Sequence, residues 1–170
     1  MGFEAEKIIV KTQLKDLLSD ENVRQMSEYI QHGTITTYIH CFNVAVISYV
    51  IATKFKIPNV CMQELLVGAM LHDFFLYDWH DGRKRPEGLH GFTHPTTALT
   101  NANKFFNLSR REQNIIQSHM FPMTITKVPK TREAIIVCIA DKVCATQETI
   151  FCSKLIRYMK YALCRRYREV

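Results

Sequence analysis

The sequence lacks the features that mark membrane or exported proteins. No apolar run in its 170 residues approaches the roughly 20 residues that a membrane helix needs. The first residues alternate acidic and basic side chains and contain no apolar signal-peptide core. The six cysteines form no C-x-x-C pair, so we expect them to be reduced, small hydrophobic residues of the core. These absences predict a cytoplasmic protein that does not bind a membrane.

The chain also lacks internal repeats, low-complexity segments and any linker that would divide it. Apolar and polar residues hardly ever alternate with the period of two that is typical of strands. With 47% hydrophobic and 22% charged residues, the composition is that of an ordinary globular protein. We therefore expect one all-α domain of about seven helices over residues 1–170. Its expected parts are an N-terminal helix (1–20), a core (22–150) and a basic C-terminal helix (151–170).

Capping residues and glycines predict where the helices begin and end. Gly33 tolerates the left-handed conformation that ends a helix, and Thr34 can cap the next one. Asn59 is a second expected cap, and Ser109 with Glu112 forms a capping box. The expected helices span residues 3–18, 22–32, 35–55, 60–75, 95–106 and 109–119. A last helix begins at Thr131 and runs, broken or continuous, toward the C-terminus.

The net charge of +6 is concentrated at the C-terminus. Residues 154–170 contain six basic side chains and one acidic side chain, which leaves about +1 for the rest of the chain. We interpret this end as a solvated basic helix end, which the helix dipole favours. Binding to nucleic acid or another anionic partner is the alternative, because Tyr158, Tyr161 and Tyr167 alternate with the charges.

Several titratable residues occupy helix positions where apolar residues are expected. His40 shares a face with Val44 and Ile47, and Asp73 shares one with Met70 and Leu66. The two carboxylates have no inward lysine or arginine on these stretches to neutralise them. A divalent cation would satisfy carboxylates and imidazoles together, whereas the alternative is a coincidental polar core. The predicted metal ligands are His40, His72, Asp73, His94, His119 and Asp141.

The order of these residues resembles the HD superfamily of metal-dependent phosphohydrolases over about residues 22–150. The stretches "HCFNVA", "GAMLHD" and "IIVCIADKVCA" are similar to its first-histidine helix, its His-Asp doublet and its terminal-aspartate helix. "GFTHPTTA" and "IIQSHMFP" resemble the two additional histidines of the binuclear branch. That branch includes HD-GYP-type cyclic dinucleotide phosphodiesterases, symmetrical diadenosine tetraphosphate hydrolases and some di-iron oxygenases. The resemblance implies that His40, His72, Asp73 and Asp141 bind one ion, and that Asp73 bridges to a second ion held by His94 and His119.

The sequence departs from the family at the lysine that often follows the doublet, where this chain has Leu76. Lys84, or Arg83 and Arg85, could supply a phosphate-binding charge from the polar loop 76–93; an exposed turn is the alternative. His80 and Trp79 could line the mouth of the pocket, or be a solvated histidine and an anchoring tryptophan. The GYP triplet is missing as well.

Three other residues of metal-binding type are not among the predicted ligands. His90 could replace His94, although Pro95 favours His94. Cys41 is expected to pack rather than to bind metal. His32 is expected at the surface or in the last turn of a helix.

We therefore expect a phosphohydrolase that acts on a small phosphorylated metabolite or a nucleotide through a metal-activated water. Asp73 and Lys84 are the expected catalytic residues, and Arg83, Arg85 and His80 the expected substrate-binding residues. Two transition-metal ions are expected, with iron or manganese favoured and zinc, nickel and cobalt as alternatives. The alternative functions are a di-iron oxygenase, a non-catalytic metal- and nucleotide-binding module, and a helical interaction protein. The sequence does not specify the oligomeric state.

Overall fold

The computed structural model describes residues 3–81 and 88–166, with side chains described as far as Ile150. This part of the chain is mostly helical, which confirms the expected all-α class. It contains α1 (Glu4–Gln13), α2 (Lys15–Ser19), α3 (Glu21–Gln25), the 3-10 helix η1 (Met26–Glu28), β1 (Ile30–His32), β2 (Ile35–Thr36), α4 (Thr37–Lys54), α5 (Met62–Leu71), α6 (His90–Phe105), α7 (Arg110–Ser118) and α8 (Arg132–Arg166). None of the described helices is both long and apolar enough to cross a membrane.

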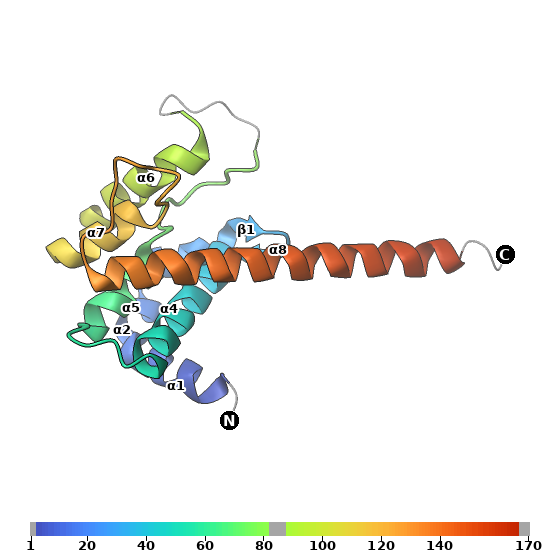
Figure 1. Ribbon diagram of the computed structural model, residues 1–170. Helices are drawn as coiled ribbons and strands as arrows, with labels where there is room; N and C mark the ends of the chain where they lie inside the picture. Colours follow the sequence, from blue (N-terminus) through green and yellow to red (C-terminus); the bar gives the residue numbers. More distant parts are fainter. Residues whose placement is uncertain (1–2, 82–87, 167–170) are drawn as a thin grey trace.

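The helices α4, α5, α7 and α8 surround the apolar core. Helix α4 packs against α5 and α8, and α7 packs against α5, α6 and α8. Val44, Leu65, Ile116 and Val137 are fully buried, one from each of these four helices. Figure 1 shows α8 crossing this group of helices and then continuing well beyond it toward the C-terminus. The packed helices hold the segments that carry the titratable residues.

Helices α5 and α7 approach each other closely at Gly68. A Cβ atom added to Gly68 would lie 2.6 Å from Cδ1 and 2.9 Å from Cβ of Ile115. Carbon atoms do not tolerate such distances, so this contact requires glycine. Gly68 lies one turn before His72, and Ile115 one turn before His119. The close contact therefore fixes the ends of two helices relative to each other.

The helix expected over residues 22–32 is wrong in its second half. After α3 and η1, Ile30 pairs with Thr36 and His32 with Ile35 in a two-stranded antiparallel hairpin. Gly33 does adopt a left-handed conformation, with φ of 60°, but it does so in the turn of this hairpin. Thr36, not Thr34, then caps α4 by accepting a hydrogen bond from the Ile39 amide.

Other helix boundaries also differ from the expected ones. Asn59 has φ of 56° and does not cap α5, whose first residue is preceded by Cys61. Helix α5 ends at Leu71, so the His-Asp doublet follows the helix rather than lying within it. The expected helix 3–18 is divided at Leu14. Helix α6 begins five residues before Pro95, which places His94 in the second turn.

Two expectations about local structure are confirmed. The Ser109 hydroxyl accepts a hydrogen bond from the Glu112 amide, and the Glu112 carboxylate accepts one from the Ser109 amide. The four cysteines with described side chains are free; Cys41, Cys138 and Cys144 are buried, and Cys61 is partly buried. The side chains of the other two cysteines lie outside the described part.

Candidate metal centre

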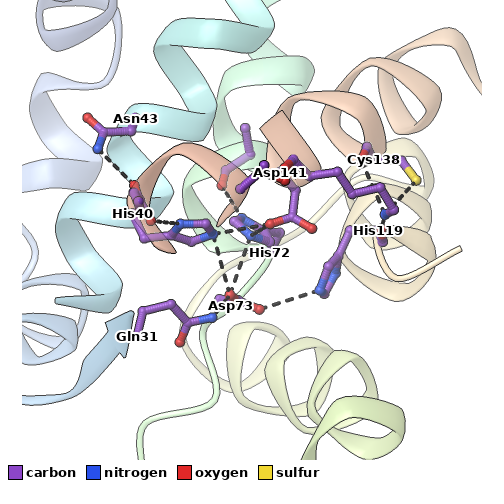
Figure 2. A network of polar contacts seen from close by, with 12 residues as sticks. Gln31, His40, Asn43, His72, Asp73, His119, Cys138 and Asp141 are labelled. Carbon is purple, nitrogen blue, oxygen red and sulfur yellow. Dashed lines mark hydrogen bonds and ion pairs between the residues drawn. The ribbon is translucent and has the colours of Figure 1, made fainter. Parts of the chain in front are cut away.

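The six residues predicted as ligands lie together in the interior. They come from five segments that the helix packing brings to one place: α4, the turn after α5, α6, the end of α7, and α8. Each side chain is buried, and Asp141 is the most exposed at 8%. Figure 2 shows five of them around a common point. The full set comprises His40, His72, Asp73, His94, His119 and Asp141.

One oxygen of Asp73 faces each half of this cluster. Its Oδ2 atom lies 3.5 Å from Nε2 of His72 and 3.9 Å from Nε2 of His40. Its Oδ1 atom lies 3.3 Å from Nε2 of His94 and 3.4 Å from Nε2 of His119. Those last two nitrogen atoms are 2.8 Å apart. The carboxylate therefore joins two separate groups of imidazoles.

Asp141 completes the first of these groups. Its Oδ1 atom lies 3.2 Å from Nε2 of His40 and 3.7 Å from Nε2 of His72. The donor atoms of these three residues all lie within 4.8 Å of one another, and the same holds for Asp73, His94 and His119. Two groups with metal-ligand spacing thus lie side by side.

All four histidines of the cluster present Nε2 to the centre because Nδ1 is bound elsewhere. Nδ1 of His72 lies 2.7 Å from the carbonyl oxygen of Ala69. Nδ1 of His94 and of His119 lie 2.8 Å from carbonyl oxygens of their own helices. A carbonyl can only accept, so these three rings carry the proton on Nδ1. Their Nε2 atoms therefore face the centre of the cluster, where a cation would take the place of any proton.

Nδ1 of His40 contacts a carboxylate instead of a carbonyl. It lies 2.8 Å from Oε2 of Glu148, and the Asn43 amide donates to the other oxygen of Glu148 at 3.1 Å. Glu148 follows Asp141 by two turns of α8, and Asn43 follows His40 by almost one turn of α4. A carboxylate on the remote nitrogen of a metal-binding imidazole fixes the ring and raises its basicity.

Gln31 makes a second contact that supports the cluster. Its amide donates to Oδ2 of Asp73 at 2.6 Å, from the β1 strand (Figure 2). Gln31 was not predicted to lie at the cluster, because its segment was expected to be helical. Glu148 could have been found, since a residue seven positions after Asp141 lies on the same face of a helix.

Charged neighbours set the protonation of the imidazoles. Burial alone would lower the pKa of His40, but the carboxylates of Asp141 and Glu148 outweigh burial and raise this pKa to about 10. Burial lowers the pKa of His119, and its contact with Asp73 compensates only in part. A proton on the first ring thus balances nearby negative charge, while His119 stays neutral.

The two aspartates are ionised in spite of their burial. Burial alone would raise the pKa of Asp73, but the positive charge of His72 and the contact with the imidazoles of His119 and His94 hold it well below its usual value. The neighbouring imidazoles of His40 and His72 likewise outweigh burial and lower the pKa of Asp141. Buried carboxylates of this kind need nearby positive charge.

The donor set fits divalent cations. Nε2 of His72 and Oδ1 of Asp73 are buried and have no hydrogen-bond partner within the described residues. Among those residues, the ion-pair partners of Asp73 and Asp141 are histidines and not lysine or arginine. Neutral imidazole and carboxylate are the usual ligands of first-row transition metals. A cation between these groups would satisfy the orphaned atoms and take over the role of the protons.

The family model of the HD domain matches residues 37–146, which is more than half of the chain. The chain belongs to the HD domain family. Comparison with curated proteins and with solved structures gave no match. The matched range includes all six residues of the cluster, whereas Gln31 and Glu148 lie outside it. Family membership thus supports metal-dependent hydrolase chemistry in general.

Two further residues of this HD domain, His32 and Cys41, lie closer to the predicted ligands than expected. His32 is partly exposed and lies in β1 rather than in the last turn of a helix, and its ring centroid lies 5.3 Å from that of His40. Cys41 is fully buried, with Sγ within 4.8 Å of donor atoms of His72 and Asp73. His90 lies outside the cluster and pairs with Tyr77 through Nδ1 at 2.8 Å.

A cavity of about 640 Å³ in this HD domain opens onto the candidate metal centre. Trp79 lines this cavity, in agreement with one of the two interpretations of the sequence. His80 is exposed and does not line the cavity. Arg83, Lys84 and Arg85, the other expected substrate-binding or catalytic residues, lie outside the described residues. Lys142, which the sequence analysis did not single out, also lines the cavity. The lining comprises Gln31, His32, Asp73, Trp79, His90, Gly91, His94, His119, Met120, Pro122, Met123, Asp141, Lys142 and Ala145.

Proposed function

We propose that this HD domain is a binuclear, metal-dependent phosphohydrolase that acts on a small phosphorylated metabolite or a nucleotide. The observation that carries the proposal is the position of Asp73. Its two oxygen atoms face two different pairs of imidazoles, at 3.3 to 3.9 Å. A carboxylate in this position suits a bridge between two cations, and such pairs of ions are typical of phosphoester hydrolysis.

Each residue of the cluster has a distinct part in this proposal. His40, His72 and Asp141 would hold one ion, His94 and His119 the other, and Asp73 both. Divalent ions held there would lower the pKa of a coordinated water and offset the negative charge of the phosphoryl group. Iron or manganese suits the donors best in our proposal, with zinc, nickel and cobalt as alternatives.

The protein contributes rigidity and a closed environment to the reaction. The Nδ1 contacts hold the rings in place, and burial excludes bulk water from the donor atoms. Electrostatic stabilisation of a phosphoryl group is stronger in such a site than in water. Lys142 adds a positive charge at the cavity wall, where an anionic ester would enter. Lys84, Arg83 and Arg85 remain proposed contributors from the loop.

Replacement of Asp73 by alanine tests the proposal. We expect the wild-type chain, purified without a chelating tag, to contain about two transition-metal ions and to hydrolyse phosphoesters with Mn²⁺ or Fe²⁺. Asp73→Ala should lose the second ion and reduce kcat by at least about 1,000-fold, because the bridge between the ions is removed. Elemental analysis and phosphate release on a panel of nucleotides, cyclic dinucleotides, dinucleoside polyphosphates and sugar phosphates measure these effects.

A matched control is Asp78→Ala, which removes an exposed aspartate from the loop after the doublet. Wild-type protein without bound metal and without phosphatase activity would refute the proposal. Oxygen consumption with the resonance signal of a mixed-valent iron pair would assign an oxygenase instead. Stoichiometric nucleotide binding without turnover would assign a non-catalytic module.

A further inference from the structure

The cavity beside the metal centre has mostly apolar walls. Met120, Pro122 and Met123 form one part of the lining, and Ala145 of α8 forms another. Trp79 belongs to a stack of rings: its indole is parallel to the His90 ring within 3°, at a centroid distance of 4.9 Å. The stack continues from His90 to His94, which belongs to the cluster. Aromatic and thioether side chains therefore lead directly to the metal-binding groups.

Few polar groups face this cavity outside the cluster, and two of them lack a partner. Nε1 of Trp79 is buried and has no hydrogen-bond partner within the described residues. The same holds for Oε1 of Gln31, a side chain that is only 7% exposed. An unpaired buried donor or acceptor is costly, so such groups commonly await a ligand or a water molecule. Two residues of the lining therefore carry one spare donor and one spare acceptor at buried atoms.

A lysine supplies positive charge at the same wall. Nζ of Lys142 donates to the carbonyl oxygen of His119 at 3.0 Å and to that of Cys138 at 3.3 Å. These contacts hold the ammonium group at the end of α7, beside the cluster. Lys142 is the one lysine or arginine among the described residues that line the cavity. It can attract a phosphate group to this side of the cavity, next to the cluster.

We infer that the cavity binds the organic part of the substrate and selects a planar aromatic or heteroaromatic group over a polyol, an inference that rests on the proposed phosphohydrolase function. A ring would bury its faces against the apolar wall that Met120, Pro122 and Met123 form, with its edge toward Trp79. An acceptor and a donor on its edge would pair with Trp79 and Gln31. A sugar presents many hydroxyl groups, most of which would lose water without gaining a partner. The volume of about 640 Å³ lies in the range of small-ligand sites.

Fluorescence of Trp79 tests the inference without any turnover. Trp79 is the single tryptophan of the chain, so its emission reports directly on the cavity. The metal-loaded protein is titrated with phenylphosphonate and with methylphosphonate, which share the anionic group and differ in the ring. We expect phenylphosphonate to bind at least about tenfold more tightly, because the ring leaves water for an apolar wall. Equal affinities would overturn the inference.

Turnover provides the second measurement. Adenosine monophosphate and ribose 5-phosphate carry the same phosphate and ribose but differ in the base. We expect kcat/KM to be at least about tenfold higher for adenosine monophosphate. If the ring is preferred in binding but neither ester is hydrolysed, the inference about the cavity stands and the proposed function fails. If both esters are hydrolysed equally and the ring is not preferred, the function stands and the inference fails.

Two neighbouring substitutions on α8 provide a matched comparison. Ala145→Phe would fill the cavity, and Thr146→Phe adds the same ring at the next, exposed position, which does not line the cavity. We expect at least about a tenfold loss of phenylphosphonate affinity in Ala145→Phe alone, with unchanged metal content in both variants. Unchanged affinity in a folded Ala145→Phe would contradict the inference. Lys142→Gln should weaken phenylphosphonate and methylphosphonate by the same factor, because both carry the anionic group.

Discussion

We expect a substitution of Glu148 to weaken the binding of one of the two proposed ions and not of the other. Glu148→Gln keeps the size of the side chain but removes the negative charge that faces Nδ1 of His40. Loss of such an outer carboxylate typically costs about 10- to 100-fold in metal affinity. His94 and His119 do not contact Glu148, so the ion that they hold should bind as before. A calorimetric titration with Mn²⁺ should show two binding steps, of which one is weakened.

Gln147→Ala is the matched control, because Gln147 is the exposed neighbour of Glu148 on α8. It should leave both binding steps unchanged. A Glu148→Gln variant in which both steps weaken equally would mean that Glu148 acts through the stability of the fold rather than through His40.

At the residue scale, the sequence predicted the buried cluster but not the residues that support it. Helical spacing placed histidines and aspartates on apolar faces, and a buried ionisable group is unusual enough to be noticed. Lys142 is exposed, and Gln31 lies in a short strand whose segment was expected to be helical. Exposed or irregular positions give no such signal, because the contacts depend on how distant segments meet. The role of each cluster residue as a ligand remains a prediction.

The close contact between α5 and α7 makes Gly68 sensitive to substitution. Gly68→Ala gains about 1 kcal/mol of helix propensity. The new methyl group would overlap Ile115, and overpacking costs about 1–3 kcal/mol. The free energy of unfolding should therefore fall by up to about 2 kcal/mol. Urea unfolding measures this change, and a metal titration should show weaker binding because both helices end at cluster residues.

Gly91→Ala is the corresponding control on α6. A Cβ atom there would lie 3.3 Å from the terminal methyl group of Met123, which is a flexible neighbour. Its stability should be unchanged or slightly raised. If Gly68→Ala proved as stable as Gly91→Ala, the close packing of α5 on α7 would not limit stability.

At the scale of elements, the sequence predicted helices better than their ends. Long amphipathic stretches give a repeated signal, and the Ser109 capping box is local, so both were found. The hairpin was missed because β1 has three residues and β2 two, too few to establish a period of two. Its formation depends on the turn at Gly33 and on packing beside α4. Similarly, Asn59 and Thr34 are residue types that often cap helices, but α5 and α4 begin later in the chain, after Cys61 and Thr36.

The residues of the candidate metal centre come from five segments, so removal of metal bound there should loosen the whole fold. An ion present at 100 times its dissociation constant stabilises a protein by about 2.7 kcal/mol. For a chain of this size, about 1 kcal/mol corresponds to roughly 2–4 °C in Tm. Dialysis against a chelator should therefore lower Tm by roughly 5–10 °C, and Mn²⁺ should restore it. Differential scanning calorimetry measures the shift.

The Asp73→Ala variant serves as the reference for this measurement, because its Tm should respond much less to the chelator. A wild-type Tm that does not change on chelation would indicate that the buried cluster is stable without cations.

Because α8 extends beyond the other helices, we expect its C-terminal part to be unnecessary for metal binding. All residues of the cluster and their described supports lie at or before Glu148, and the later turns continue away from the packed helices (Figure 1). A chain that ends at Ile150 should keep the metal content and the phosphatase activity of the full chain within about twofold. Elemental analysis and phosphate release test this. Loss of metal from a folded, shortened chain would show that residues 151–170 support the centre.

The hydrogen bonds at Nδ1 have a consequence for the choice of ion. A ring tied to a carbonyl of its own segment cannot swing to follow a larger or smaller cation. Discrimination by ionic radius would then reside in the backbone of the turns after α5 and α7, since many metals accept the same donors. A change in the backbone of either turn would therefore change which metal ion is preferred, without the substitution of any proposed ligand residue.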